Sequence, residues 1–554
     1  MIALVLVCML TAAYGQNLQV TTNEGTIEGY PATDGNYYTF HGIPYAEPRI
    51  GMDKFKVSKS TLLGVLHAYD TGVRCARPTP DGIIGSENCL TLDVFTNRVN
   101  TSKPVLVWLN GEESNSSMST QYSFKRYVEE GMVVVTLNYR LSIFGFLCLR
   151  IPAAPGNAGL KDILLGLQWV QRNIAVFGGN PNNVVLMGHG SAAAMVDMIT
   201  LSPKSKNLVN KAISFSGSAL APWAVSYDPV GSVFAFMAAM DKTTFSLDGI
   251  VEFLSFNDNL NTINSAINDL KYTNNTQLFA PCIEDKTVED AVLIDAPMNL
   301  LRAGDYSSIP YIAGYVTEEG TVRAEEAMYD EWLEKMQAAF TNFLPVDLQL
   351  RENQTVVTDS IRDFYFGKNP INMSSVERYL QYHGDTMVVV PLIRGVRERA
   401  VTSQSETRLL EFGYMGSLNS ELKFDQIPLN GVKHGGILNF LFDLNVKAED
   451  ENVTISLVKR ISAFAHTGNP TPSGSTNWPA IISNQPTPYF YYGDNSQGSS
   501  HVEESRLNPQ NDVMTFWNDL YDHYYYPPSA SSSASRLVGL LSVLLWCLIV
   551  LVMF

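Results

Sequence analysis

The sequence predicts an α/β fold with a mainly parallel central sheet that helices cover on both faces. Continuous apolar runs predict buried strands, and the stretch 158–179 predicts a helix that ends at a pair of glycines. The predicted strands lie at residues 104–109, 132–141, 182–187 and 211–218. Apolar strands that alternate with helices favour parallel pairing, because parallel neighbours need a crossover connection between them.

The chain outside these strands adds a hairpin and a linker. Residues 18–30 alternate apolar and polar side chains around Asn23-Glu24-Gly25, which predicts a β-hairpin. We find no internal repeat. The Pro-, Ser- and Ala-rich segment 527–535 is a low-complexity linker, and it leads into an apolar C-terminal tail at 536–554.

Both ends of the chain are typical of processing signals. Residues 1–15 form an apolar run that ends in small residues, as a secretory signal peptide does, so we expect Gln16 to begin the mature chain. The C-terminal tail has no polar residue after its apolar run, which favours a GPI-attachment signal with the attachment site near Ser529, Ala530 or Ser531, of which we take Ser529. The alternative is a single C-terminal transmembrane anchor. Either predicts a protein on the extracellular face of the plasma membrane.

The composition excludes one class of partner. The 554 residues are 45% hydrophobic and 17% charged, which is a globular composition, and they carry a formal net charge of −17. Lysines and arginines form no long run. Because nucleic-acid binding depends on a basic patch, we predict no nucleic-acid partner.

The cysteines and sequons agree with a secreted chain. In an oxidising compartment Cys75 and Cys89 could close a short loop, worth roughly 3 kcal/mol in the chain-entropy model. Cys148 lies in an apolar run, which indicates a buried free thiol, and the sequence leaves a bond to Cys282 open. N-glycosylation is predicted at Asn100, Asn115, Asn274, Asn353, Asn372 and Asn452.

Several blocks together carry a family resemblance. They lie at residues 37–51, 86–95, 133–147, 157–188, 216–223 and 464–470. In order and spacing the chain resembles the type-B carboxylesterase/cholinesterase family. The resemblance implies one large α/β-hydrolase domain, which we place at 16–526. It also supports the Cys75–Cys89 bond, because the family bonds two cysteines in this position.

The nucleophile elbow is the first test of activity. The pattern G-x-S-x-G needs a small residue on each side of the serine, and only the centre Gly190 has them, in Gly188 and Ala192. The nucleophile position therefore holds a glycine. Ser191 lies one residue later, where we interpret it as a residue that starts the following helix and satisfies a free backbone N–H.

Of the remaining parts of the site, the oxyanion loop departs from the family pattern, whereas the acid and base positions match it. Family enzymes carry glycines in the oxyanion loop, whereas here Gly111 is followed by Glu112 and Glu113, and a glycan at Asn115 would stand near the mouth of the site. The resemblance places Glu319 as the triad acid and His434 as the base. No close-spaced metal-ligand motif occurs, so we expect neither a metal nor a cofactor.

Because two catalytic parts depart from the family pattern, we predict that the chain is not an enzyme. We expect a catalytically inactive cell-surface glycoprotein that resembles neuroligins, neurotactin, glutactin and gliotactin, with an adhesion or recognition role. Its partner would be an extracellular protein or a small apolar ligand, and the sequence leaves a homodimer open. The alternative is a weak or altered carboxylic ester hydrolase that uses Ser191 with His434 and Glu319.

Overall fold

The computed structural model describes residues 17–56, 64–111, 123–242, 246–256, 260–420, 431–442, 446–494 and 501–530. The predicted signal peptide and the predicted C-terminal tail lie outside these residues. Within the described part of the chain, no helix combines the length and the apolar character that crossing a membrane requires.

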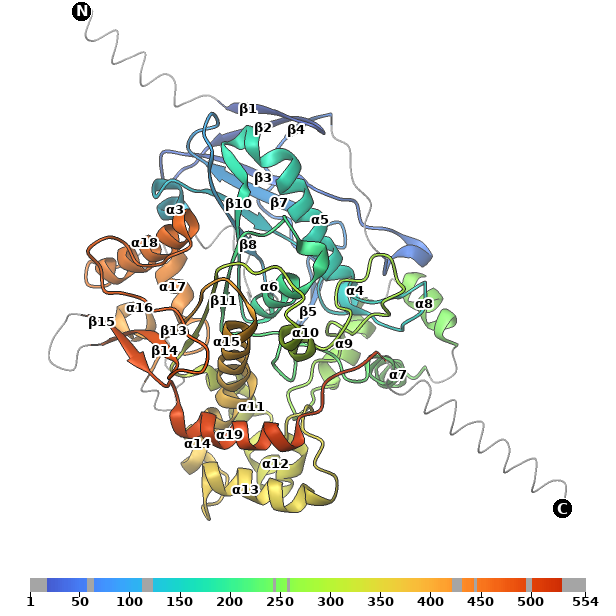
Figure 1. Ribbon diagram of the computed structural model, residues 1–554. Helices are drawn as coiled ribbons and strands as arrows, with labels where there is room; N and C mark the ends of the chain where they lie inside the picture. Colours follow the sequence, from blue (N-terminus) through green and yellow to red (C-terminus); the bar gives the residue numbers. More distant parts are fainter. Residues whose placement is uncertain are drawn as a thin grey trace, which may run out of the picture.

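A large mixed sheet forms the centre of the molecule (Figure 1). Its strands, in spatial order, are β1 (Leu18–Thr22), β2 (Gly25–Pro31), β3 (Tyr38–Pro44), β7 (Thr91–Thr96), β9 (Val133–Leu137), β8 (Lys103–Leu109), β10 (Gly179–His189), β11 (Lys211–Phe215), β12 (Tyr311–Val316), β13 (Thr407–Gly413), β14 (Pro488–Asp494) and β15 (His501–Leu507), with β4 (Val65–His67) beside β2. From β9 to β14 all neighbours are parallel, and the other neighbours in this order are antiparallel. β4 lies parallel to β2. The predicted parallel centre is confirmed.

The central strands are apolar on both faces because each face is covered. Along β8, Val105 and Val107 pack into one hydrophobic cluster, whereas Leu106 and Trp108 pack into a second one. Side chains that alternate along a strand point to opposite faces of the sheet. Two cores therefore lie on the two sides of one sheet, which is why the sequence shows continuous apolar runs.

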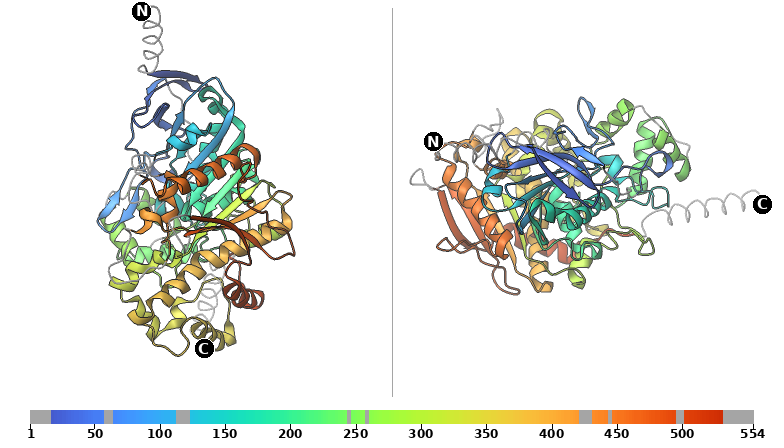
Figure 2. Two further views of the ribbon diagram at one scale, coloured as in Figure 1. Left: turned by 90° about the vertical axis from the view of Figure 1, so that its left-hand side faces the viewer. Right: turned by 90° about the horizontal axis from the view of Figure 1, so that it is seen from above.

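Helices cover both faces of the sheet (Figure 2). One core includes buried residues of α3 (Lys125–Glu129), α17 (Gly436–Phe442) and α18 (Glu451–Thr467). The other includes buried residues of α5 (Ala158–Asn173), α6 (Ser191–Leu201), α10 (Pro297–Ala303) and α15 (Val390–Thr402). The structure thus matches the predicted arrangement of layers.

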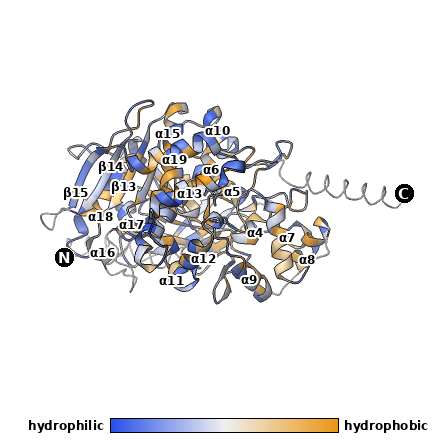
Figure 3. Cartoon of the chain, turned by 90° about the horizontal axis from the view of Figure 1, so that it is seen from below, coloured by the Kyte–Doolittle hydropathy of each residue, from blue (hydrophilic) through white to orange (hydrophobic). Residues whose placement is uncertain are grey.

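Further helices surround these layers. They are α4 (Ser142–Phe146), α7 (Pro229–Ala239), α8 (Leu247–Phe256), α9 (Leu260–Asp269), α11 (Ala324–Tyr329), α12 (Trp332–Ala338), α13 (Gln354–Phe366), α14 (Val376–Gly384), α16 (Gly416–Ser420) and α19 (Asn511–Tyr524), and a small ribbon joins β5 (Arg77–Thr79) to β6 (Gly82–Ile84). Hydrophobic and hydrophilic residues alternate along the outer helices, as in amphipathic helices (Figure 3).

The predicted bounds of the N-terminal hairpin and of the helix at 158–179 differ from the observed ones by a few residues. The hairpin turns at Asn23 and Glu24, because Thr22 pairs with Gly25. The helix predicted to run to the glycine pair ends earlier, at Asn173, and a 3-10 turn follows it. Gly178 then takes a left-handed conformation with φ of 85°, which ends the turn and lets Gly179 start β10.

Two disulfides cross-link the described chain. Cys75 bonds to Cys89, the pair that the sequence and the family resemblance favoured. Cys148 bonds to Cys282, 134 residues later, so its interpretation as a free thiol is wrong. Burial in an apolar run fits a half-cystine as well as it fits a thiol, so the sequence pattern could not separate the two.

A buried ion pair ties α6 to α15. Asp197 lies 2.7 Å from the guanidinium of Arg399, and both side chains are almost fully buried. The second carboxylate oxygen of Asp197 accepts hydrogen bonds from the Ala219 N–H and the Ser218 hydroxyl. These bonds also hold the loop after β11 against α6, so one carboxylate connects three parts of the fold.

Replacing Asp197 by leucine should destabilise the protein by about 3–5 kcal/mol, because Arg399 would keep its charge in the core without a carboxylate. The double variant Asp197→Leu/Arg399→Met should recover part of this loss. Thermal unfolding measures both. As a control, Asp330→Asn breaks the exposed pair with Lys271 and should cost less than 1 kcal/mol. Equal losses in Asp197→Leu and Asp330→Asn would contradict the argument.

Candidate active site

The site is centred on the turn between β10 and α6. β10 ends at His189, Gly190 follows with φ of 59° and ψ of −124°, and α6 begins at Ser191. A residue with a side chain is strained in this backbone conformation, at a cost of about 1–3 kcal/mol. Gly190 adopts it freely, and it brings no side chain to the centre of the turn.

Backbone packing around the turn is too close for side chains. A Cβ on Gly188 would lie 2.7 Å from the carbonyl carbon of Ala192, and a Cβ on Gly217 would overlap the carbonyl oxygen of Gly190. The Gly190 N–H also donates to the carbonyl of Phe215 at 2.9 Å. The turn is therefore held between its own helix and the loop after β11.

Ser191 is the first residue of α6, and Gly190 takes the N-cap position. The capping position is thus one residue earlier than the interpretation of Ser191 assumed. Ser191 is buried, and its Oγ lies 3.6 Å from the position that a Cβ on Gly111 would occupy. The hydroxyl is therefore close to the start of the predicted oxyanion loop. Glu112, Glu113 and Asn115 lie outside the described residues.

Glu319 follows the carboxyl end of β12, at the same edge of the sheet as the β10–α6 turn, with β11 between the two strands. β12 ends at Val316, and Glu319 starts the 3-10 turn η4 (Glu319–Arg323). The side chain is fully buried and folds back, so that its Oε1 accepts the Val316 N–H at 2.9 Å. One carboxylate oxygen is thereby fixed by the backbone, and the other is turned toward His434.

His434 pairs with Glu319, as the family resemblance predicts. The distance from His434 Nδ1 to Glu319 Oε2 is 2.5 Å. The backbone N–H of His434 donates to the Thr321 hydroxyl, and Glu318 forms a parallel β-bridge with Lys433. The loops that carry Glu319 and His434 are therefore held side by side. Because Nδ1 faces the carboxylate, the other ring nitrogen, Nε2, is the one that can act as a base.

The structure adds one neighbour to this pair. The His189 ring lies 4.8 Å from the His434 ring, measured between centroids, and His189 directly precedes Gly190. The contact places His434 against the end of β10. The imidazole, the glycine turn and the Ser191 helix start thus lie together. The sequence shows His189 next to the elbow, but nothing in it indicates a contact with His434.

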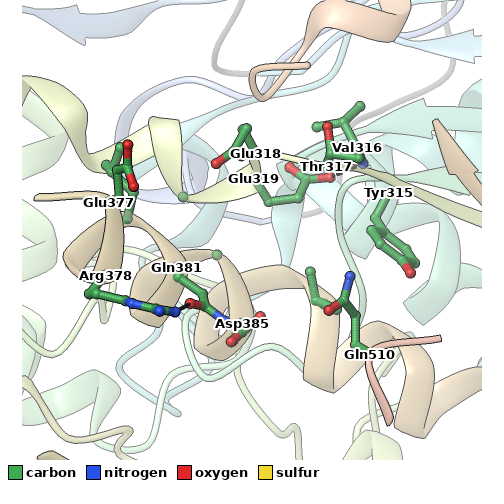
Figure 4. A pocket seen from close by; sticks show the side chains of 14 residues that line it. Tyr315, Val316, Thr317, Glu318, Glu319, Glu377, Arg378, Gln381, Asp385 and Gln510 are labelled. Carbon is green, nitrogen blue, oxygen red and sulfur yellow. Dashed lines mark hydrogen bonds between the residues drawn. The ribbon is translucent and has the colours of Figure 1, made fainter. Parts of the chain in front are cut away.

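A cavity of about 320 Å³ lies behind Glu319 (Figure 4). Its lining includes Glu318, Glu319, Glu377 and Asp385. Burial raises the pKa of Glu318, and the negative charge of Glu377 adds to the rise. Glu319 therefore has other carboxyl groups on its cavity side and the His434 imidazole on its other side.

Asp385 is the most strongly shifted of these carboxylates. It is buried at the start of a π-helical segment (Asp385–Val389), and it accepts a hydrogen bond from the Tyr365 hydroxyl at 2.9 Å. Burial raises its pKa to about 7, the Tyr365 bond acts in the opposite direction, and the charge of Glu318 adds to the rise. Sequence reasoning missed this residue, since nothing near it marks a site.

Comparison with known proteins shows the family to which the chain belongs. Residues 16–517, which include the Glu319–His434 pair and the β10–α6 turn, match the model of the carboxylesterase family. The chain belongs to the carboxylesterase family. A carboxylic ester hydrolase of Bombus ignitus is 26% identical over 91% of this chain and 94% of its own length. A juvenile hormone esterase of Tribolium castaneum is 27% identical over 84% of this chain and 86% of its own length.

A solved structure confirms the fold. A juvenile hormone esterase of Manduca sexta, with OTFP covalently attached, superposes with a TM-score of 0.81. The two sequences are 23% identical, and the match covers 92% of this chain and all of the other. The α/β-hydrolase fold with its large sheet and surrounding helices is therefore shown.

These comparisons contradict the prediction that the chain is not an enzyme. The similar proteins are named as esterases, and the comparisons give no support to a likeness to neuroligin-type adhesion proteins. The prediction of an inactive site rested on Gly190, Glu112 and Glu113, and two of these lie outside the described residues. The described part contains the Glu319–His434 contact.

Among the described residues, no group of three or more His, Cys, Asp or Glu side chains is arranged to hold a metal ion. The described sequon asparagines are exposed or half-buried: Asn100, Asn274, Asn353, Asn372 and Asn452. Each of these five is thus at a surface that a glycan could occupy.

Asp385 should make the stability of the protein fall as pH rises from 4 to 7. The folded state keeps the proton in this range while the unfolded state, with an ordinary Asp pKa, has released it. Asp385→Asn should remove this dependence. The free energy of unfolding of the variant, relative to that of wild type, should therefore be about 2 kcal/mol higher at pH 8 than at pH 5. Unfolding midpoints at both pH values test this, with the exposed Asp363→Asn as the control. The same pH dependence in wild type and Asp385→Asn would refute it.

Proposed function

We propose that this protein hydrolyses carboxylic esters, with His434 as the general base and Glu319 as the group that orients it. The observation that carries the proposal is the 2.5 Å contact between His434 Nδ1 and Glu319 Oε2 beside the β10–α6 turn. A carboxylate on Nδ1 fixes the imidazole tautomer that takes a proton at Nε2, and it stabilises the imidazolium that forms. Membership of the carboxylesterase family supports the substrate class.

In this proposal Ser191 supplies the attacking hydroxyl. Its proton passes to His434 Nε2, its oxygen bonds to the ester carbonyl carbon, and His434 returns the proton to the leaving alkoxide. Water then hydrolyses the acyl-serine by the same steps. Ser191 heads α6, whose first turn offers backbone N–H groups and the positive end of the helix dipole to the developing oxyanion.

The position of Ser191 predicts slow turnover. Its Cα is one residue, about 3.8 Å, from that of Gly190, which takes the centre of the turn. A displacement of about 1 Å from the reactive geometry already costs roughly 100-fold in rate. We therefore expect kcat/KM to lie below about 10⁴ M⁻¹s⁻¹, the low end of the usual range for enzymes.

Hydrolysis of p-nitrophenyl esters of increasing acyl length by the purified protein tests this function. His434→Gln should lower kcat/KM at least 100-fold, because general-base catalysis contributes about that much. Ser191→Ala should do the same and should abolish labelling by a fluorophosphonate probe. Ser214→Ala is the matched control, since Ser214 is a buried serine on β11 whose hydroxyl bonds to Ala193 of the same helix.

The outcomes separate the parts of the proposal. Wild-type protein that releases no p-nitrophenol above the buffer rate from any ester in the series would refute the function. Activity that survives Ser191→Ala but not His434→Gln would keep the base and refute the serine. Activity unchanged in both variants would place the hydrolysis outside this site.

We also propose that the mature chain starts at Gln16, carries N-linked glycans and is held at the outer face of the plasma membrane through a GPI group at Ser529. The signal-like residues 1–15, the tail at 536–554 and the exposed sequons support this. Phosphatidylinositol-specific phospholipase C should release the protein from membranes into the soluble fraction. Retention on the membrane after complete digestion of a known GPI-anchored control would favour the transmembrane alternative.

A further inference from the structure

One end of the molecule carries a cluster of exposed apolar side chains. Ile50, which precedes the 3-10 turn η1 (Gly51–Asp53), is 88% exposed, and Phe256, the last residue of α8, is 64% exposed. The two segments touch, because a Cβ on Gly51 would lie 3.8 Å from the Phe256 ring. Met52 on the same turn is also exposed. We call the surface formed by Ile50, Met52 and Phe256 the η1–α8 patch.

Neighbouring helices extend the η1–α8 patch. Phe234 on α7 and Leu260 at the start of α9 are further exposed apolar residues, and α7 contacts α9. In Figure 1 the helices α7, α8 and α9 lie at one end of the molecule, and the right-hand view of Figure 2 shows the green helices at that same end. Large apolar side chains that gather on one face mark an interaction surface, whereas single ones are ordinary.

The C-terminal segment is fixed beside this patch. Arg150 donates from Nη2 to the Ser529 carbonyl at 2.8 Å. The same arginine lines a cavity together with Lys56, which follows η1. Tyr526 is exposed on one side, and its ring lies 6.4 Å from the Tyr227 ring, measured between centroids, just before α7 begins. Figure 1 shows the segment leaving α19 and ending near α7. Ser529 is therefore close to both η1 and α7.

A membrane anchor at this point brings the same end of the molecule to the bilayer. A GPI group joined to Ser529 leaves the Ser529 carbonyl in place as an amide oxygen, so the bond from Arg150 persists in the mature protein. With a transmembrane tail instead, Leu537 begins the apolar run seven residues after Ala530, a distance of at most about 25 Å. With either anchor, the η1–α8 patch faces the lipid surface.

The charges near the patch favour a neutral lipid surface. Lys54 and Lys56 follow η1, and each has a carboxylate partner, Glu87 at 2.7 Å and Asp53 at 2.6 Å. The chain as a whole carries a formal charge of −17, which anionic lipids repel. Burial of apolar side chains, rather than attraction to anionic headgroups, therefore has to supply the binding.

We propose that the η1–α8 patch rests on the lipid bilayer that anchors the protein, with Ile50, Met52 and Phe256 inserted among zwitterionic headgroups. Apolar groups of interfacial proteins enter a membrane to a depth of about 5–10 Å. Tyr526 lies near the anchor, and tyrosine rings are enriched at the interface between membrane and water. A protein partner would have to fit between this face and the bilayer, within the reach of the anchor. The proposal rests on the membrane anchor proposed above and not on ester hydrolysis.

Fluorescence at single positions tests the contact. The cysteines of the described chain are bonded in pairs, so a cysteine introduced at the surface is the thiol that a water-soluble nitrobenzoxadiazole reagent labels. The full-length anchored protein, reconstituted into phosphatidylcholine vesicles, should show blue-shifted emission and protection from aqueous iodide in Ile50→Cys and Phe256→Cys. Leu507→Cys is the matched control, because Leu507 is 63% exposed on β15, at the opposite end of the molecule from α8 (Figures 1 and 3).

The released protein gives a second measurement. After phospholipase C removes the lipid of a GPI anchor, the soluble chain should still float with phosphatidylcholine vesicles at millimolar lipid, in low salt and in high salt alike. The double variant Ile50→Ser/Phe256→Ser should bind about tenfold or more weakly, since burying even one large apolar side chain contributes about that factor. Leu507→Ser should bind as wild type. Equal unfolding midpoints confirm that the variants are folded.

The outcomes separate the patch from the anchor. Dyes at positions 50 and 256 that remain as accessible to iodide as the dye at 507 would overturn the patch and leave the anchor in place. Protein absent from the membrane fraction would refute the anchor; purified protein mixed with phosphatidylcholine vesicles then decides the patch, which a blue shift at position 256 supports and unchanged emission overturns. Dimers that dissociate in the double variant, without contact to lipid, would assign the patch to a second copy and also overturn the proposal.

Discussion

The architecture of the site depends on how closely backbone packs against backbone around the β10–α6 turn. Gly188 meets the first turn of its own helix, and Gly217 meets the carbonyl of Gly190, at distances that leave no room for a Cβ. These contacts set where α6 starts and how it leaves the sheet. The position of every polar group near the turn, including His189 and Ser191, follows from this packing.

The turn that carries Glu319 is held by a second set of backbone contacts. A Cβ on Gly320 would overlap the Leu380 carbonyl, and a Cβ on Gly384 would lie 2.7 Å from the Gly320 N–H nitrogen, so α14 rests directly on the turn that carries Glu319. The buried carboxyl group of Asp385 lies in the same contact. The carboxyl groups and the packing on the cavity side of Glu319 are thus linked, through the Glu319 side chain, to the His434 imidazole.

Much of this arrangement could be predicted, and the failures are informative. Apolar runs located the central strands because covered strands need apolar side chains on both faces, and family blocks pointed to Glu319 and His434, which the structure brings into contact. The partner of Cys148 could not be found, because burial says nothing about a second cysteine 134 residues away. The prediction of inactivity went wrong for another reason: it extended the residue types at Gly190, Glu112 and Glu113 to the function of the whole chain, which similar esterases contradict.

The long disulfide has a consequence for how the protein is made. The segment between Cys148 and Cys282 contains β10, α6 and β11, so the turn that forms the site is synthesised before the second cysteine exists. At translation rates of about 5–20 residues per second, the two cysteines are separated by roughly 7–27 s of synthesis. The Cys75–Cys89 bond, with a separation of 14 residues, can close within a few seconds. The nascent chain therefore carries a reduced Cys148 while the centre of the sheet assembles, and the early Cys75–Cys89 bond removes the two nearest cysteines as wrong partners for it.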